Sequence, residues 1–260
     1  MTGSIHITRW GDSGPRVILV HGGVQGSAAA GERNFSNQRV LAERGWQLIV
    51  PDRPGHGRSP DPGRPDDAEA DGAWIADLLG DGAHLVGHSY GGACALNAAA
   101  RRPSSVHSLT LIEPAMHAIA RSDPRVMRFL FRMVTTMLFS TSAASRATRM
   151  MKLLGIPPEA GSRSREELEQ LGKNARRGRL PSKATLDREL GQVERAGIPL
   201  LVVTGGWSPA FEASSDLVAA TGGGRRVVIR SPHHFPQWVS DEFNQRLVAF
   251  MEESDAKRHI

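Results

Sequence analysis

The sequence predicts an α/β fold, a mostly parallel twisted sheet flanked by helices, with a helical cap inserted late in the chain. Short apolar runs alternate with helical patterns through the first 114 residues, as expected for strands buried on both faces of a parallel sheet. One run, 83–86, passes through a Gly-His-Ser-Tyr-Gly turn directly into an Ala-rich helix. After Pro114 the alternation stops, and helical patterns alone continue to about residue 196. The 260 residues therefore suit one domain with an insertion rather than two full-sized domains.

The expected strands are short and mostly apolar, and the helices between them form the crossovers, which are right-handed in parallel sheets. In chain order the expected strands are 5–10 at an edge, 17–20, 48–50, 83–86, 106–112, 200–204 and 227–229. The expected helices of the same layer structure are 37–44, 68–79, 93–100, 211–220 and 241–251. We therefore expect residues 1–114 and 197–260 to form the core domain.

The remaining segment, 115–196, is predicted to be a helical cap. A capping residue followed by proline, Asp123-Pro124, marks the start of one helix. Ser164 and Glu167 have the spacing of a capping box and start a second, and 183–195 has the pattern of a third.

The first cap helix carries an apolar stripe at three- and four-residue steps, with arginines on the opposite face. The stripe consists of Val126, Phe129, Leu130, Met133, Met137 and Leu138. Such a stripe packs on the core domain or lines a substrate cavity, and the pattern alone does not separate the two. Because methionine adapts to irregular apolar ligands, we expect Met133 and Met137 to contact substrate.

Composition excludes several classes of protein. The net charge is +5, and residues 115–195 carry 16 Lys and Arg against 8 Asp and Glu, yet no nucleic-acid-binding motif accompanies this basic segment. The single cysteine, Cys94, excludes an internal disulfide and fits a reducing compartment. No signal peptide or membrane-spanning run stands out. We expect a cytoplasmic protein, with a homodimer as one option for its assembly, that binds neither nucleic acid nor membrane.

The Gly-His-Ser-Tyr-Gly turn is the strongest chemical signal in the sequence. A strand that turns straight into a helix holds the central residue, Ser89, in a strained conformation and needs small neighbours, here Gly87 and Gly91. The hydroxyl of Ser89 then lies near the positive end of the following helix, where negative charge is favoured. The alternative is a glycine-rich turn in which the serine is incidental.

Four motifs in this order resemble the α/β-hydrolase superfamily, and the resemblance covers nearly the whole chain. They are His-Gly-Gly at 21–23, the turn 52–59, the Gly-His-Ser-Tyr-Gly-Gly elbow at 87–92 and His-Phe-Pro at 234–236. The resemblance implies that Ser89 is the nucleophile and His234 the base, with His233 as the alternative base. It also implies that the backbone amides of Gly23 and Tyr90 form the oxyanion hole.

The acid departs from the majority pattern of that superfamily. The turn after the strand 200–204 has Ser208 where most members have an aspartate. Some branches, including haloalkane dehalogenases and a fungal lactonase, take the acid from the end of the strand that follows the nucleophile helix. That position is Glu113 here, and an ionised carboxylate at the exit of a buried strand is costly unless it is paired. A carboxylate of the next helix, Glu212 or Asp216, would replace Glu113 if it lay nearer to the histidine.

The resemblance implies a serine hydrolase that cleaves a carboxylic ester or lactone of a largely apolar small molecule through an acyl-enzyme. Val24 and Trp207 are expected to contact substrate together with the two methionines of the cap. No metal-ligand or nucleotide-binding pattern stands out, so no metal and no cofactor is expected. Two alternatives remain open. One is a non-hydrolytic enzyme on the same fold, a carbon–carbon bond lyase or a cofactor-free oxygenase, and the other is a small-molecule binding protein.

Overall fold

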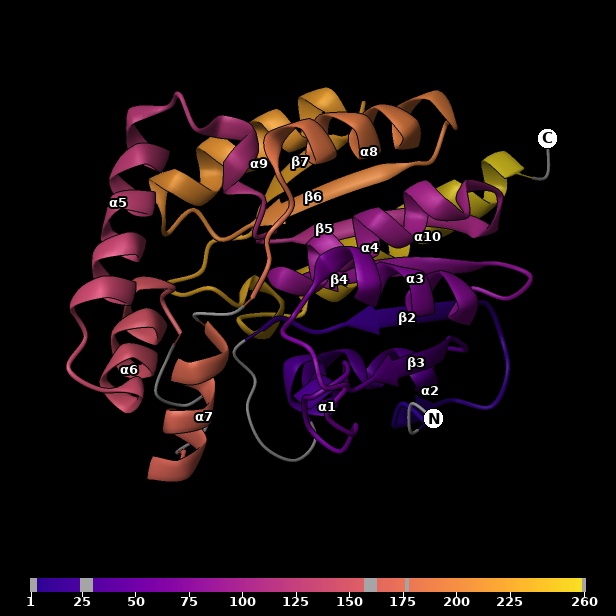
Figure 1. Cartoon of the computed structure of the whole chain (residues 1–260). Coiled ribbons are helices and arrows are strands. Elements are labelled where there is room, and N and C mark those ends of the chain that lie inside the picture. The colour runs from indigo at the N-terminus through magenta and orange to yellow at the C-terminus, as the bar shows by residue number, and fades with distance from the viewer. Residues whose placement is uncertain (1–3, 24–29, 157–162, 176–177, 259–260) are drawn as a thin grey trace.

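The computed structural model describes residues 4–23, 30–156, 163–175 and 178–258, and it contains a seven-stranded sheet of order β1-β3-β2-β4-β5-β6-β7 (Figure 1). The first strand pairs antiparallel with β3, and the other neighbours pair in parallel. The strands are β1 (Ile7–Trp10), β2 (Arg16–Val20), β3 (Gln47–Pro51), β4 (Ala83–His88), β5 (Val106–Ile112), β6 (Leu200–Thr204) and β7 (Arg225–Val228). The predicted fold class is confirmed.

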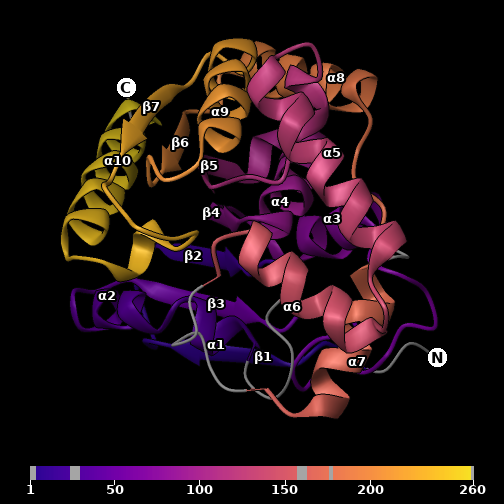
Figure 2. The ribbon, with the colours of Figure 1, turned by 90° about the vertical axis from the view of Figure 1, so that its left-hand side faces the viewer.

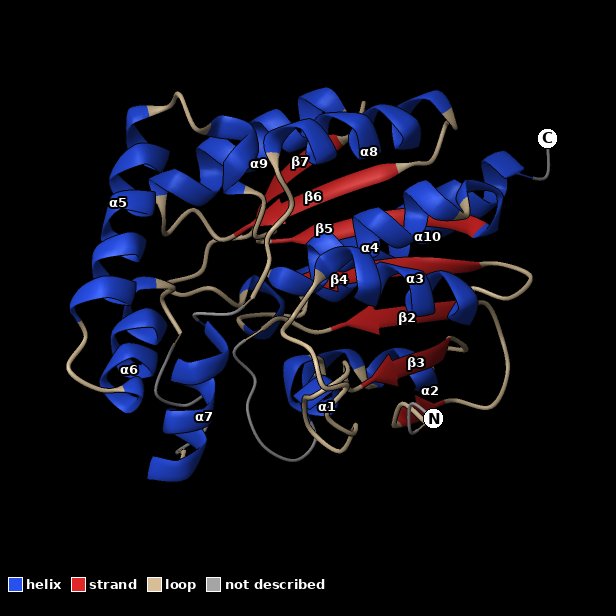
Figure 3. Ribbon diagram, in the orientation of Figure 1, coloured by secondary structure: helices blue, strands red, loops and turns tan. Residues whose placement is uncertain are grey.

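Helices cover both faces of this sheet, as Figure 3 shows. One face packs against α3 (Ala68–Leu78), α4 (Tyr90–Arg101), α8 (Lys183–Arg195) and α9 (Pro209–Thr221). The other face packs against α1 (Ala30–Asn34), α2 (Val40–Glu43) and α10 (Glu242–Arg258). The all-apolar strand runs are buried between these two layers, which explains why they lack the alternation of a one-sided sheet.

Three helices lie beyond the carboxyl ends of the strands (Figures 1 and 2). They are α5 (Pro124–Phe139), α6 (Ala143–Leu153) and α7 (Arg165–Ala175). The side chain of Asp123 accepts the Arg125 N–H at the start of α5. The predicted capping box is present at α7, because Ser164 N–H donates to Glu167 Oε2 (2.8 Å) and Glu167 N–H donates to Ser164 Oγ (3.2 Å).

The last helix of the segment 115–196 has a different environment. Leu186, Leu190 and Val193 of α8 are buried in the same core cluster as α4. Thus α8 belongs to the layer that covers the sheet, whereas α5–α7 lie over the strand ends. The division of the chain into core and cap at 115 and 196 stays a prediction.

Two predicted helices are wrong in extent. The single helix at 37–44 is instead a 3₁₀ turn (Ser36–Gln38) followed by α2, and α1 precedes both. Side chains of the turn bond to a distant loop, with Gln38 Nε2 donating to the Gln237 carbonyl (3.0 Å), and such tertiary bonds leave no local signal. The last helix continues to Arg258 instead of ending at Met251. Within the described residues, no helix is long and apolar enough to cross a membrane.

Candidate active site

Ser89 occupies a sharp turn between β4 and α4. Its backbone has φ +55° and ψ −120°, a conformation that non-glycine residues adopt only under constraint from their surroundings. The constraint comes from β5 and the loop after it. The Ser89 N–H donates to the Ile112 carbonyl (2.8 Å), and the Ser89 carbonyl accepts the N–H groups of Gly92 and Ala115 (both 3.0 Å).

The two flanking glycines are required by close packing. A Cβ on Gly87 would lie 2.5 Å from the Gly91 carbonyl oxygen, and a Cβ on Gly91 would collide with the Val20 carbonyl. The strand and the helix therefore approach as closely as the sequence predicts. This geometry holds the serine at the carboxyl end of β4, as in a nucleophile elbow.

Gly23 and Tyr90 lie side by side beneath the same cavity as Ser89. A Cβ on Gly23 would be 3.5 Å from the Tyr90 Cβ. The Tyr90 N–H is the first of α4, so it has no carbonyl one turn earlier in the helix to bond. Val24, predicted to contact substrate, lies outside the described residues.

A buried arginine holds the turn that carries Gly23. Arg53 Nε donates to the His21 carbonyl (3.2 Å), and Arg53 Nη1 donates to Asp71 (2.6 Å) and Asp66 (3.3 Å). Burial alone would raise the pKa of Asp66, but the Arg53 charge holds it well below its usual value. The guanidinium also lies 4.8 Å from the centre of the Tyr90 ring, so one cation supports both sides of the predicted oxyanion hole.

His234 follows β7 and is buried beside Glu113. Its Nδ1 lies 3.3 Å from Glu113 Oε2, close to the upper limit of a hydrogen bond. Since a carboxylate only accepts, Nδ1 carries the proton and Nε2 has the lone pair. Nε2 has no hydrogen-bond partner among the described residues. The hydrogen bond from Ser89 to Nε2 that proton transfer requires is therefore not formed in this structure.

The backbone of His234 is fixed from two sides. Its N–H donates to the Gly155 carbonyl, which follows α6 (3.1 Å), and its carbonyl accepts His88 Nε2–H (2.8 Å). Because His88 donates through Nε2, its Nδ1 accepts the Asn34 side-chain N–H (2.9 Å). His233 bonds within its own loop, to Ser231. The pairing with Glu113 therefore distinguishes His234 from His233.

Glu113 is fully buried at the end of β5, with φ +45°. Its Oε1 accepts the Gly205 N–H (2.6 Å), and its Oε2 accepts the Trp207 indole N–H (3.1 Å). The competing carboxylates bond elsewhere, since Glu212 and Asp216 both contact Arg226. Glu113 is thus the carboxylate that faces His234 Nδ1.

Burial moves the pKa values of this pair in opposite directions. Desolvation raises the pKa of Glu113 to about 7, although the bonds from Gly205 and Trp207 oppose the rise. Desolvation also lowers the pKa of His234 to about 3. Both shifts disfavour charge in a dry site. The imidazole is consequently neutral at pH 7 and able to accept a proton.

Trp207, which the sequence predicts to contact substrate, lies next to Glu113. The indole binds the Glu113 carboxylate and does not line the cavity over Ser89. The turn after β6 folds back over the end of β5, which brings the ring to the acid. Sequence reasoning therefore missed a donor for the carboxylate. The sequence shows only that this tryptophan stands in the turn that most superfamily members use for their aspartate, and nothing local indicates that its N–H points to Glu113.

The cavity over Ser89 has a volume of about 150 Å³ and is mostly apolar. The segment from α5 to α7 contributes Met133, Ala147, Met150, Leu154 and Leu171. Met137 is not among the lining residues, and Leu138 is 62% exposed. Only part of the predicted apolar stripe of α5 therefore faces the cavity or the core. The buried residues of α5, Val126 and Phe129, lie in its first two turns, whereas Leu138 lies in its last turn and is exposed.

His117 also lines the cavity and was not singled out from the sequence. Ser214 Oγ–H donates to the Ala210 carbonyl (2.9 Å), so His117 Nδ1–H donates to Ser214 Oγ (2.9 Å). The lone pair of this buried imidazole is therefore on Nε2.

Comparison with known proteins decides the family. The sequence model of the alpha/beta hydrolase fold matches residues 15–241. This chain belongs to the α/β-hydrolase family. It is 31% identical to Lipase LipV of Mycobacterium tuberculosis over 245 residues, 92% of this chain and 82% of the lipase. It is 29% identical to a 2-hydroxy-6-oxo-6-phenylhexa-2,4-dienoate hydrolase of Comamonas testosteroni, over 95% of this chain and 91% of that enzyme.

Solved structures agree on the fold. The N-acyl homoserine lactonase AidH in complex with N-hexanoyl homoserine has a TM-score of 0.69 at 19% identity, covering 96% of this chain and 93% of the lactonase. At that identity the likeness shows the fold alone. The relatives make this α/β hydrolase an enzyme of the hydrolase class.

Proposed function

We propose that this α/β hydrolase cleaves a carboxylic ester or lactone of a largely apolar small molecule through an acyl-enzyme on Ser89. The observation that carries the proposal is the meeting of two features at one end of the sheet. Ser89 stands on a strained elbow beneath an apolar cavity, and Glu113, which contacts His234, lies at the end of the neighbouring strand β5. The names of the relatives, a lipase and an esterase among them, support the ester class.

The residues divide the reaction as follows. His234 Nε2 takes the hydroxyl proton of Ser89 while Oγ attacks the substrate carbonyl carbon, and the backbone N–H groups of Gly23 and Tyr90 bind the resulting oxyanion. Glu113 keeps the proton on Nδ1 and supports the imidazolium charge. The imidazolium then protonates the leaving alkoxide, which leaves an acyl group on Ser89. Water, deprotonated by His234, attacks the acyl carbon and restores the serine.

Charge in the cavity favours a neutral substrate. Among the described residues that line it, none is lysine or arginine, whereas Asp66 is an anion held by Arg53. Among these described residues a substrate carboxylate would meet no cation, and it would face the negative charge of Asp66. The predicted cap, formed by α5–α7 within 115–196, would cover the apolar part of the substrate.

The two methionines of α5 give a matched test of this substrate class. Met133→Lys is expected to raise KM for a medium-chain nitrophenyl ester by about tenfold or more, because it puts a charge into an apolar cavity. Met137→Lys changes the same residue type on the same helix outside the lining and is expected to leave KM within about twofold. Equal effects of the two substitutions would contradict the assigned cavity.

The acid limb of the pH profile is expected near pH 7, because the Glu113–His234 pair takes up one proton there. The pKa of Glu113 is raised to about 7 and that of His234 is lowered to about 3, and the apparent value belongs to the pair. Above pH 7 the carboxylate is charged and the imidazole accepts the Ser89 proton. Below pH 7 the pair binds one more proton, so either the carboxylate loses its charge or the imidazole can no longer accept the Ser89 proton. The value of kcat/KM therefore falls as the pH falls. A profile flat down to about pH 5 would contradict this.

A second candidate reaction is cleavage of a carbon–carbon bond, which the Comamonas testosteroni relative favours. A substrate panel separates it from the first. Nitrophenyl esters and lactones of graded acyl length are expected to turn over, and a 2-hydroxy-6-oxo-dienoate is not, because none of the described residues that line the cavity is a lysine or arginine that could bind its carboxylate. Turnover of the dienoate alone would replace the proposal. Tight binding of the esters without turnover would indicate a binding protein.

A further inference from the structure

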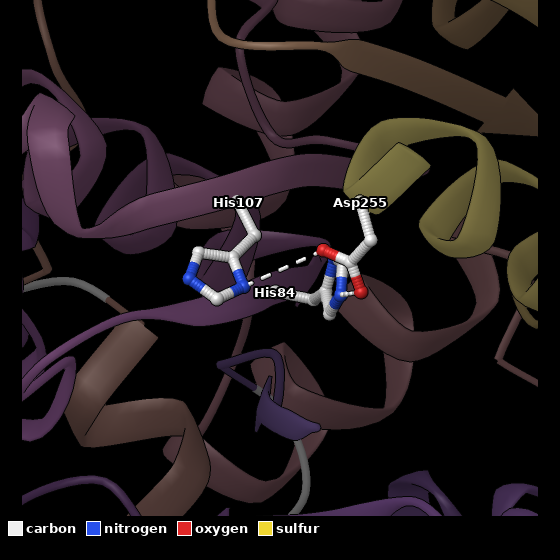
Figure 4. Close-up of side chains that lie close together, drawn as sticks. All are labelled: His84, His107 and Asp255. Carbon is white, nitrogen blue, oxygen red and sulfur yellow. Dashed lines mark hydrogen bonds and ion pairs between the residues drawn. The ribbon is translucent and has the colours of Figure 1, made fainter. Parts of the chain in front are cut away.

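Three possible metal ligands meet at the end of the sheet opposite to Ser89. His84 is the second residue of β4, His107 is the second residue of β5, and Asp255 lies near the end of α10 (Figure 4). His84 Nε2 is 3.2 Å from Asp255 Oδ2, and His107 Nδ1 is 3.6 Å from Asp255 Oδ1. One ligand atom from each residue lies within 4.8 Å of the other two. None of these residues takes part in the proposed hydrolysis.

A local irregularity of the sheet brings the two histidines together. The pairing of β4 with β5 shifts between Ala83 and His84, so Ala83 pairs with Val106 and His84 pairs with Ser108. His107 is the extra residue of this bulge. In a regular strand, adjacent side chains would point to opposite faces, and a bulge re-aims one of them. The His107 ring consequently packs edge-on against the His84 ring, with centroids 5.3 Å apart.

Neighbouring residues shape the cluster further. Ser108 Oγ lies 2.8 Å from His84 Nδ1, which leaves Nε2 as the nitrogen that faces Asp255. A polar partner on the second ring nitrogen is the usual support of a metal-binding histidine. Gly82 has φ +143°, and a Cβ there would collide with His107 Nε2, so the glycine makes room for the ring.

We propose that His84, His107 and Asp255 bind a zinc ion. Bonds of about 2.0–2.2 Å at tetrahedral angles put ligand atoms about 3.3–3.6 Å apart. The distance from His107 Nδ1 to Asp255 Oδ1, 3.6 Å, has that spacing, and the distance from His84 Nε2 to the other carboxylate oxygen, 3.2 Å, is slightly shorter. Two imidazoles and a carboxylate are zinc ligands, and water completes the shell. His107 and Asp255 are 23% and 27% exposed, so solvent reaches the site and both side chains have room to adjust.

The ion would join the last helix to the sheet. His84 and His107 belong to neighbouring strands and Asp255 to α10, so a bound ion adds three links between elements far apart in sequence. It stabilises the folded chain in proportion to its occupancy. One nearby charge opposes it, that of Arg258, which donates to the Val106 carbonyl.

The test is zinc binding by the untagged, chelator-treated full chain. Calorimetry is expected to give one zinc per chain, and the melting temperature to rise by about 5–10 °C at free zinc about 100 times Kd. Magnesium is expected to give neither effect, because it selects oxygen ligands. The kcat for ester hydrolysis is expected to stay unchanged, since the site lies at the other end of the sheet.

Substitutions distinguish zinc binding at this site from adventitious zinc binding elsewhere on the chain. His107→Gln is expected to weaken zinc binding by at least about 100-fold, and Ser108→Ala by about 10–100-fold, because the Ser108 hydroxyl orients the His84 ring. His6→Gln, a histidine outside the cluster, is the matched control and is expected to leave Kd unchanged. Zinc binding that is absent in the parent chain, or equal in His107→Gln and the control, would overturn the proposal. Retained ester turnover shows that each variant is folded.

Discussion

Ser89→Ala is expected to lower kcat for ester hydrolysis by about 10⁴–10⁶-fold, because removal of the nucleophile abolishes the acyl-enzyme route. The fold should survive. The strained backbone at Ser89 is held by its own main-chain groups, because its N–H donates to the Ile112 carbonyl and its carbonyl accepts the N–H groups of Gly92 and Ala115. Alanine keeps all three hydrogen bonds. Steady-state kinetics and the melting temperature together check the prediction. A variant that folds and retains a tenth of the parent rate would place the chemistry elsewhere.

Glu113→Gln is expected to cut kcat by about 10³–10⁴-fold with little change in KM. The scale comes from the corresponding change of aspartate to asparagine in serine proteases, where the histidine adopts the wrong tautomer. Here the amide would offer its N–H or its oxygen to His234 Nδ1, at the position where the carboxylate now lies at 3.3 Å. The charge that supports the imidazolium would also be lost. Steady-state kinetics with one ester measures both constants.

Ser208→Ala is the matched control for the acid. Ser208 stands where most members of the family have an aspartate, and its side chain makes no capping hydrogen bond to α9. A hydroxyl supplies no charge to the imidazole, so kcat is expected to change by less than about twofold. A large loss in this variant together with a small loss in Glu113→Gln would reverse the assignment.

The parts of the site that the sequence predicts are those that depend on local chain geometry. The elbow needs small residues around Ser89, and the pattern of Gly87 and Gly91 about the serine is enough to indicate it. Glu113 is predicted from the resemblance, which puts the acid at the end of the strand after the nucleophile helix, and from the cost of an unpaired carboxylate there; the structure puts His234 beside it. The catalytic roles of Ser89, Glu113 and His234, the cytoplasmic location and the homodimer stay predictions.

The features that the sequence does not reveal depend on contacts between distant segments. Trp207 reaches Glu113 because two strand ends are neighbours in the sheet, and no local pattern indicates that the indole N–H points to the acid. His88 holds the carbonyl of His234 across 146 positions of the chain. Likewise, α8 has an amphipathic pattern like that of α5 to α7, but it packs on α4. The sequence pattern does not show which element such a helix packs against, because that depends on tertiary contacts.

The central claim is that Ser89 carries the acyl group of the substrate, and the mass of the quenched enzyme tests it most directly. The enzyme is mixed with a nitrophenyl ester, quenched in acid within the first turnover and measured intact, then digested to find the modified peptide. We expect one acyl group per chain, on the peptide that contains Ser89, and none in Ser89→Ala. Turnover of the ester with no acyl group on that peptide, or with the acyl group on another residue, would contradict the claim.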